Sequence, residues 1–253
     1  TYRIGRGPAR EHLKLASNWD RKRVNNVIAR IPGSTWPDEW VIRGNHHDAW
    51  VNGAQDPSSG MAAELEEARA MGQLLRQGWR PKRTIVYAAW DGEEQGLIGS
   101  VEWVEQHEQE LRDRAVAYIN TDGNSRGFLS AGGSHALEQL VNRVARDLVD
   151  PDTKLSVWKR AQARVISTGP PAARAEARSR SDLRIAALGS GSDYSAVLQP
   201  AGVPTLNLSF SGHSPTDGIY HPIYDDFYPF STFVDRDFAY GRALAETVGT
   251  TVL

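Results

Sequence analysis

Histidines and acids follow the apolar runs of this chain at five places. Imidazole and carboxylate groups are ligands that zinc and neighbouring divalent metals accept. Two imidazoles and three carboxylates from separate segments can hold two cations, and a further carboxylate beside them can act as a base. The residue types therefore predict a two-metal hydrolytic site. The residues in question are His46 with Asp48, Asp56, Glu93 with Glu94, Asp122, and His221.

The first of these places is His46-His47-Asp48, directly after an apolar run. Residues i and i+2 on an extended backbone point the same way. His46 can therefore bind metal while Asp48 lies close enough to orient its imidazole. His47 is expected to point away and to be structural or at the surface.

Asp56, Glu93 and Glu94 each allow two interpretations. The Asp56 carboxylate could bridge two ions, or Asp56-Pro57 could simply begin the helix that follows. Adjacent glutamates repel each other if both face one metal, so Glu93 and Glu94 suit separate roles as proton carrier and ligand. The alternative is a solvated acidic turn, because Asp91 adds a third acid within four residues.

Asp122 and His221 complete the series. Asp122 is one more acid at the end of an expected strand, and His221 lies between Tyr220 and Pro222. A single histidine among aromatic residues is more often structural than functional. Each signal is weak alone, but their joint order along alternating strands and helices is demanding.

The elements that must position these residues follow from hydrophobic periodicity. Strands alternating with helices predict a three-layer α/β/α sandwich with a central mixed β-sheet. In such sheets ligands gather beyond the carboxyl ends of the strands, which is where the acids and histidines fall. The expected strands are Leu13–Ser17, Asn26–Ile31, Trp40–Gly44, Thr84–Trp90, Ala115–Asn120 and Thr205–Phe210. One expected helix begins at Ser59 and stops at Gly78. Three more are expected over Val101–Leu111, Ala136–Val149 and Val234–Val248.

Three segments are expected to be loops: Thr1–Pro8, Pro32–Asp38 and Arg160–Arg184. The last is rich in Ala, Arg, Ser and Pro, and a long mobile loop is the expectation. Its arginines could meet an acidic substrate, but a solvated loop is the simpler interpretation.

Composition narrows the function classes. The chain has 253 residues, 40% of them apolar, which suits one large folded domain. A net charge of -2 gives no electrostatic case for binding nucleic acid, and the absence of cysteine excludes a thiol nucleophile and cysteine-bound zinc. No apolar run is long enough to span a membrane. The chain does not begin with Met, so we expect a piece of a longer protein whose compartment is not readable.

At these motifs the sequence resembles the co-catalytic zinc exopeptidases, and within them the glutamate carboxypeptidase and transferrin-receptor branch. The likeness runs from Thr1 to about Val248. The stretches that carry it are His46–Val51, Asp56–Gly60, Gly78–Ile85, Trp90–Glu94, Gly96–Ser100, Val116–Asn120, Leu188–Asp193 and Tyr220-His221.

The resemblance implies a role for each matching residue. Asp56 would bridge two zinc ions, His46 and Asp122 would complete one site, and Glu94 and His221 the other. Glu93 would be the general base that takes a proton from the bridging water, and Asp48 the partner of His46. Tyr220 would stabilise the oxyanion, and Gly191 and Ser192 would form part of the substrate cleft. A cis peptide bond between Asp56 and Pro57 is also implied.

The resemblance implies a context as well. Residues 1–253 are expected to be the catalytic zinc peptidase domain of a longer chain, without the apical and C-terminal helical domains of the branch. Peptide or dipeptide substrates, a homodimer of the full-length protein and an extracytoplasmic location are further expectations. Asn207 and Ser209 stand where glutamate-specific relatives carry arginines, so the resemblance does not imply selectivity for acidic peptides.

Three functions remain in competition. The first is a dizinc exopeptidase that hydrolyses a terminal peptide bond. The second is a non-catalytic binding module like the receptors of the branch, which the retention of all five ligand positions and Glu93 disfavours. The third is acyl transfer of the glutaminyl-cyclase type on the same fold, disfavoured by the closer local match to carboxypeptidases.

Overall fold

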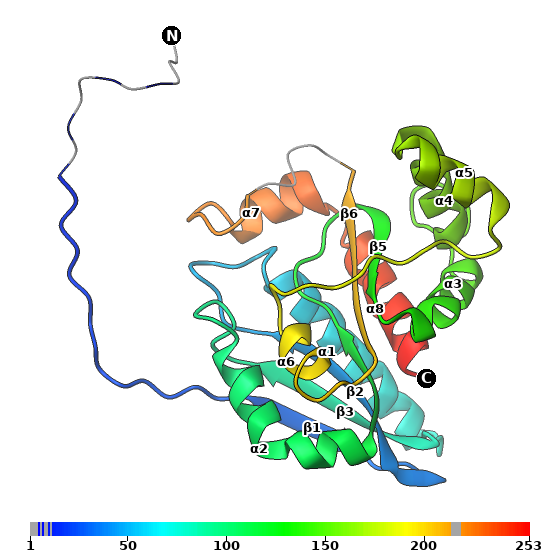
Figure 1. Ribbon diagram of the computed structural model, residues 1–253, viewed down its shortest axis with the longest axis horizontal. Helices are drawn as coiled ribbons and strands as arrows, with labels where there is room; N and C mark the ends of the chain where they lie inside the picture. Colours follow the sequence, from blue (N-terminus) through cyan, green and yellow to red (C-terminus); the bar gives the residue numbers. More distant parts are fainter. Residues whose placement is uncertain (1–4, 6, 8–9, 11, 214–218) are drawn as a thin grey trace.

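The computed structural model describes residues 5, 7, 10, 12–213 and 219–253 (Figure 1). Within them, six strands form one sheet in the order β1-β3-β2-β4-β6-β5. Strands β3, β2, β4 and β6 are parallel, and the two edge strands β1 and β5 are antiparallel to their neighbours. The bounds are β1 Val27–Ile31, β2 Trp36–His46, β3 Arg83–Trp90, β4 Ala115–Asn120, β5 Gly127–Gly133 and β6 Thr205–Gly212.

Helices cover one face of the sheet through a large apolar core. Alternate residues of the strands point to this face, among them Ile85, Ile119 and Leu208, and all three are buried. The long helices α1 and α8 pack on each other and on this face. The helices on this side are α1 Ser58–Arg76, α3 Glu138–Asp147, α4 Val157–Thr168 and α8 Ala239–Val252.

The opposite face carries a second core. Here the other set of alternate residues, including Ile42, Trp90 and Tyr118, packs beneath α2 Ile98–Arg114 and α6 Tyr194–Leu198. The two cores on opposite faces make the molecule a three-layer α/β/α sandwich, as the alternation of strands and helices predicts. The expected mixed sheet is confirmed.

The prediction of a loop over Arg160–Arg184 is wrong. Most of this stretch belongs to α4 and to α5 Pro171–Ser179. Arginine and alanine are good helix formers, and Pro171 stands at the start of α5, where proline is tolerated. Several charges of this stretch are paired, since Glu176 accepts from both Arg180 and Arg184. Asp150 likewise pairs with Arg160.

The expected strand Leu13–Ser17 is also absent. Leu13 and Leu15 are 79% and 77% exposed, and the described residues 12–23 run as an extended segment away from the body (Figure 1). An alternating pattern makes a strand only where a neighbouring strand supplies hydrogen bonds. The loop expected over Pro32–Asp38 ends early, because β2 begins at Trp36. The loop expected over Thr1–Pro8 lies largely outside the described residues.

Sequence periodicity placed α1, α2 and α3 closely but missed some short elements. Strand β5 escaped because its sequence contains three glycines, and α6 because it has only five residues. The helix expected from Val234 begins at Ala239, after Asp235 has capped its first turn. Shorter elements are η1 His135–Leu137, α7 Phe227–Pro229 and the π-helical η2 Phe230–Val234. Among the described helices, none combines the length and apolarity needed to cross a bilayer.

Candidate metal centre

The carboxyl ends of three parallel strands and two nearby loops bring the predicted residues together. His46 is the last residue of β2, Glu93 and Glu94 follow β3, and Asp122 follows β4. Asp56 precedes α1, and His221 lies between β6 and α7. Two groups result, each with ligand atoms within 4.8 Å of one another: His46 with Glu93 and Asp122, and Asp56 with Glu94 and His221.

Asp56 belongs to the second group but faces both, with one carboxylate oxygen toward the imidazole of each. Its Oδ1 is 3.1 Å from Nε2 of His46, and its Oδ2 is 3.0 Å from Nε2 of His221. The backbone enters α1 through a cis bond to Pro57, as the resemblance implies. The carboxylate therefore has the orientation that a bridging ligand requires.

The hydrogen bonds of His46 leave one lone pair for a cation. Its Nδ1 lies 3.0 Å from the carbonyl oxygen of Asp48, which can only accept, so Nδ1 is the donor. In the neutral ring, Nε2 then presents a lone pair to carboxylate oxygens of Asp56 and Asp122, at 3.1 and 3.2 Å. Lone pairs that face one another need a proton or a metal ion between them.

The same arrangement recurs around the second imidazole. Nε2 of His221 lies 3.0 Å from Asp56 and 3.2 Å from Oε2 of Glu94. Oδ1 of Asp56 is buried, and no hydrogen-bond donor of the described residues meets it in suitable geometry. The donor set of nitrogen and oxygen atoms fits zinc.

Burial and neighbouring charge perturb the titration of the site. Burial alone lowers the pKa of His46, but the neighbouring carboxylates of Asp122, Asp48 and Asp56 outweigh it and raise that pKa strongly. Burial raises the pKa of Glu93 to about 8. Burial and the nearby Asp56 charge raise the pKa of Glu94. Such perturbed groups are characteristic of functional sites.

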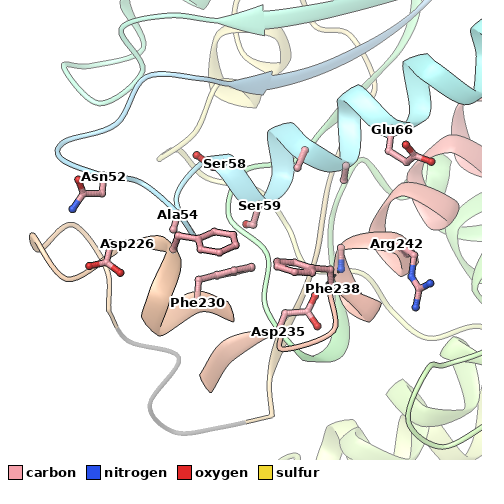
Figure 2. Close-up of a pocket in the computed structure, with 14 residues that line it drawn as sticks. Asn52, Ala54, Ser58, Ser59, Glu66, Asp226, Phe230, Asp235, Phe238 and Arg242 are labelled. Carbon is pink, nitrogen blue, oxygen red and sulfur yellow. Dashed lines mark hydrogen bonds between the residues drawn. The ribbon is translucent and has the colours of Figure 1, made fainter. Parts of the chain in front are cut away.

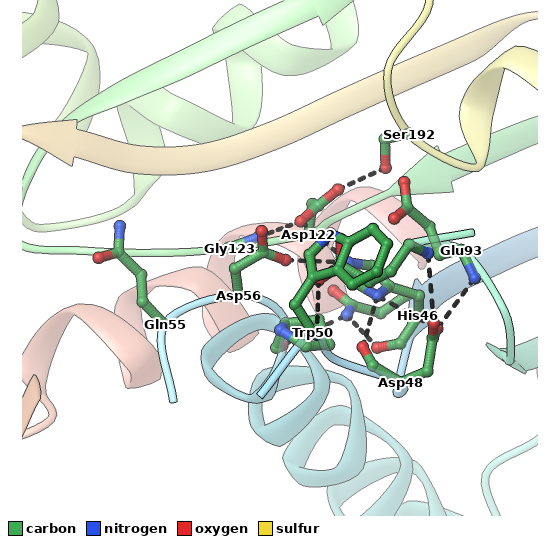
Figure 3. A network of polar contacts seen from close by, with 12 residues as sticks. His46, Asp48, Trp50, Gln55, Asp56, Glu93, Asp122, Gly123 and Ser192 are labelled. Carbon is green, nitrogen blue, oxygen red and sulfur yellow. Dashed lines mark hydrogen bonds and ion pairs between the residues drawn. The ribbon is translucent and has the colours of Figure 1, made fainter. Parts of the chain in front are cut away.

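Asp48 lies beside His46, as predicted, but its carboxylate does more than face the ring. The carboxylate accepts the backbone N–H groups of Glu93 and Glu94, at 3.0 and 3.2 Å (Figure 3). Its nearer oxygen is 3.5 Å from Nδ1 of His46. Asp48 thus ties the end of β2 to the loop that carries both glutamates. His47 points away and is exposed, as expected.

Two aromatic side chains border the centre. The Tyr220 ring stacks on His221 with ring centroids 3.7 Å apart and is 64% exposed. Trp50 packs edge-on against His221 and donates its backbone N–H to Glu94. The rim of the site is therefore aromatic and open to solvent.

The two predicted cleft residues differ in exposure. Gly191 is exposed, with a positive φ of 115°. Ser192 is 3% exposed, and its hydroxyl contacts Asp122. Their role toward substrate stays a prediction.

Sequence reasoning missed two supporting residues. The Asp225 carboxylate accepts the backbone N–H groups of Gln55 and Asp56, which holds the loop before α1 in place. Asn45 donates to the carbonyl oxygen of His46 and accepts from Thr121, linking the ends of β2 and β4. The position of Asn45 beside a predicted ligand was the only available signal.

An apolar cavity lies apart from these ligands. Its volume is about 790 Å³, and three phenylalanines line it between α1 and the segment leading into α8 (Figure 2). None of the predicted metal ligands contributes to its wall. The cavity therefore does not hold the chemistry predicted from the sequence. The phenylalanines are Phe227, Phe230 and Phe238.

Comparison with known proteins agrees with this geometry. The profile of peptidase family M28 matches residues 26–233. The chain belongs to peptidase family M28. A probable glutamate carboxypeptidase, LAMP1, of Arabidopsis thaliana is 37% identical over 258 residues, covering 100% of this chain and 35% of its own. The aminopeptidase NAALADL1 of Mus musculus is 34% identical over 270 residues, with 100% and 35% covered. This M28 chain thus spans about a third of the length of these relatives.

Solved structures show the same fold for this M28 chain. The zinc aminopeptidase BSAP of Bacillus subtilis aligns with a TM-score of 0.59 at 18% identity, covering 90% of this chain and 49% of that one. A glutaminyl cyclase of Porphyromonas gingivalis aligns with a TM-score of 0.56 at 16% identity, covering 90% and 75%. At these identities the likeness concerns the fold alone.

Proposed function

We propose that this M28 chain is a metallo-exopeptidase domain that uses two zinc ions to hydrolyse a terminal peptide bond. The observation that carries the proposal is the placement of Asp56, whose two oxygens each face a different imidazole at 3.0–3.1 Å. One carboxylate with that orientation can serve two cations. His46 and Asp122 would hold one ion, and Glu94 and His221 the other.

When bound, two zinc ions would lower the pKa of a water and stabilise negative charge on the substrate. Three ligand carboxylates, from Asp56, Glu94 and Asp122, balance much of the charge of such a pair. Asp48 fixes the ends of β2 and the 93–94 loop relative to each other, so that the two half-sites keep their spacing.

Glu93 is proposed as the general base. It lies in the His46 group and is half-buried, and burial raises its pKa to about 8. A carboxylate with a pKa near neutrality can both accept and return a proton, which is the property a shuttle needs. Tyr220, whose ring stacks on His221, is proposed to donate its phenol hydrogen toward a developing oxyanion.

The substrate is proposed to be a peptide without a requirement for an acidic side chain. The side-chain oxygen of Asn207 in β6 accepts a hydrogen bond from Asn120, and this side chain carries no charge. Ser209, the next residue on the same side of β6, is also neutral. A carboxylate side chain would therefore find no guanidinium at these two positions.

A direct test compares peptide hydrolysis with and without zinc. The full-length protein and its Glu93→Gln variant would be assayed on matched dipeptides with a free or blocked amino terminus and a free or blocked carboxy terminus. Zinc-dependent cleavage of one unblocked set by the wild type, lost in Glu93→Gln, is the expected result. Cyclisation of an amino-terminal glutamine peptide without hydrolysis would instead support the acyl-transfer alternative. Zinc binding without turnover of any substrate would support a non-catalytic module.

A further inference from the structure

A row of buried hydrogen bonds leads from the core to one proposed metal ligand. Nε1 of Trp90 lies 2.9 Å from the Tyr118 hydroxyl, which lies 2.7 Å from Oδ1 of Asn120. Nδ2 of Asn120 lies 3.0 Å from the Ser192 hydroxyl. That hydroxyl lies 2.6 Å from Oδ2 of Asp122, as Figure 3 shows. The row crosses the sheet from β3 to β4 and ends at the metal centre.

The chemistry of its members sets the direction of every bond. An indole N–H can only donate, so the Tyr118 oxygen accepts from Trp90. The Tyr118 hydroxyl then donates its own hydrogen to Oδ1 of Asn120. The Asn120 amide nitrogen then donates to Ser192 and, with its second hydrogen, to Asn207. The Ser192 hydroxyl therefore donates its hydrogen bond to the Asp122 carboxylate.

The row is closely enclosed. Trp90, Tyr118 and Asn120 are fully buried, and Ser192 is 3% exposed. Gly44 of β2 lies directly beneath the link between Trp90 and Tyr118. A Cβ at this position would stand 2.4 Å from the Tyr118 hydroxyl and 2.6 Å from Nε1 of Trp90. The glycine therefore leaves the space that the two polar groups occupy over β2.

We propose that Ser192 is a positioning residue for Asp122, an inference that rests on the proposed metal centre. Its hydroxyl donates to Oδ2, while the backbone N–H of Gly123 donates to Oδ1 at 2.7 Å, so that Oδ1 remains directed at Nε2 of His46, 3.2 Å away. Because Asn120 holds the serine oxygen, the serine cannot rotate without breaking two buried bonds. Ser192 thus fixes which carboxylate oxygen of Asp122 faces the proposed ion.

The test compares three variants with the wild type. Ser192→Ala removes the hydroxyl, Ser192→Thr keeps it, and Ser190→Ala alters an exposed serine two residues away as a control. Zinc affinity would be measured by competition with a chromophoric chelator, and the orientation of Asp122 from metal-free crystals. We expect Ser192→Ala to weaken binding of one zinc ion by about 10–100-fold, as loss of a partner behind a ligand does. Its Asp122 carboxylate should turn away from His46, while the other two variants keep wild-type affinity.

Several outcomes would overturn the inference. Wild-type zinc affinity in Ser192→Ala is one, and equal weakening in Ser190→Ala is another. Weakened binding with Asp122 unmoved also overturns it, since Ser192 would then act by another route. If the wild type binds no zinc, the proposed function fails, and the position of Asp122 in the metal-free crystals alone decides the role of Ser192. Peptide hydrolysis enters none of these measurements.

Discussion

The two halves of the proposed centre are built differently. His46 and Asp122 sit at or just after the ends of the central strands β2 and β4, and the His46 side chain is 1% exposed. His221 lies outside any helix or strand, with a side chain 35% exposed and a positive φ of 67°. Glu94 follows β3 in a turn that Asp48 ties down. One half thus rests on the sheet and the other largely on connecting segments.

The difference teaches how the two sites should behave. Ligands held by packed strands and buried hydrogen bonds need little ordering when a metal arrives, whereas an exposed histidine on a connecting segment must lose conformational freedom. We therefore expect the ion held by His46 and Asp122 to bind more tightly than the ion held by Glu94 and His221. Asp56 serves both and should matter most.

The largest effect is expected from Asp56→Asn. The amide keeps the shape of the carboxylate but removes the charge that both sites share, so both zinc ions and all peptidase activity should be lost. Metal content after gel filtration, measured by atomic emission, would check this. Retention of two ions per chain by Asp56→Asn would contradict a bridging role.

Glu93→Gln should separate chemistry from binding. A glutamine cannot carry the proton, so hydrolysis should fall by about 10²–10⁴-fold, the usual contribution of general acid–base catalysis. Zinc content should stay at the wild-type level, because Glu93 is not among the proposed ligands. The same metal loss in Glu93→Gln as in Asp56→Asn would make Glu93 a ligand instead.

The contrast between the halves is tested by a pair of matched substitutions. His221→Ala should abolish only the weaker phase of a zinc titration, followed by isothermal calorimetry, and leave one ion bound. His46→Ala should abolish the tighter phase. If both variants lose the same phase, or if the wild type shows one phase with a single affinity, the two halves are not energetically distinct.

The smallest effect is expected on the free energy of unfolding, through the buried ion pairs that join β2 to α1. Arg43 is buried between two glutamates of α1, and one guanidinium neutralises only one of them. Glu67 makes the two-pronged contact, at 3.0 and 3.2 Å, and burial raises the pKa of Glu64 from 4.5 to about 8. Folding therefore favours protonated Glu64. This contribution to the free energy of unfolding is complete below pH 4.5 and is lost as the pH rises through about 8.

Urea unfolding between pH 5 and pH 8 would measure this dependence. One proton changes the free energy of unfolding by at most about 1.4 kcal/mol per pH unit, and Glu64→Gln should reduce the slope by up to that amount. Zinc affinity at pH 7 should stay unchanged in the variant. An unaltered slope would mean that Glu64 is already ionised in the folded chain.

The sequence predicted the location of a side chain well where that location follows from the arrangement of the sheet. His46 and Asp122 end apolar parallel strands, and such ends meet at one edge whatever the connecting loops do. The order of the strands could not be read, because it depends on which apolar faces pack together. Ser192 illustrates a further limit: its contact with Asp122 joins residues 70 positions apart and has no local pattern.

The prediction of a loop where α4 and α5 lie was wrong for a different reason. The composition of α4 and α5 is that of a solvated loop, but Asp150 pairs with Arg160, and the guanidinium groups of Arg160 and Arg164 lie over the Phe128 ring. The prediction of a strand over Leu13–Ser17 was wrong in the opposite way. Its alternation is that of a strand, but no strand lies beside it among the described residues. Local patterns therefore mislead wherever a distant partner decides the outcome.

The extended segment before β1 has a practical consequence for handling the protein. Endoproteases bind their substrates as extended backbone, and residues 12–23 already have that form, with Arg21, Lys22 and Arg23 exposed. From Asn25 onward the chain is fastened, because the Asn25 N–H donates to Asp91 and its carbonyl oxygen meets His47. Brief trypsin treatment should therefore trim the chain at this basic run and stop at the folded body. The trimmed product would keep every proposed metal ligand and would be the better candidate for crystallisation.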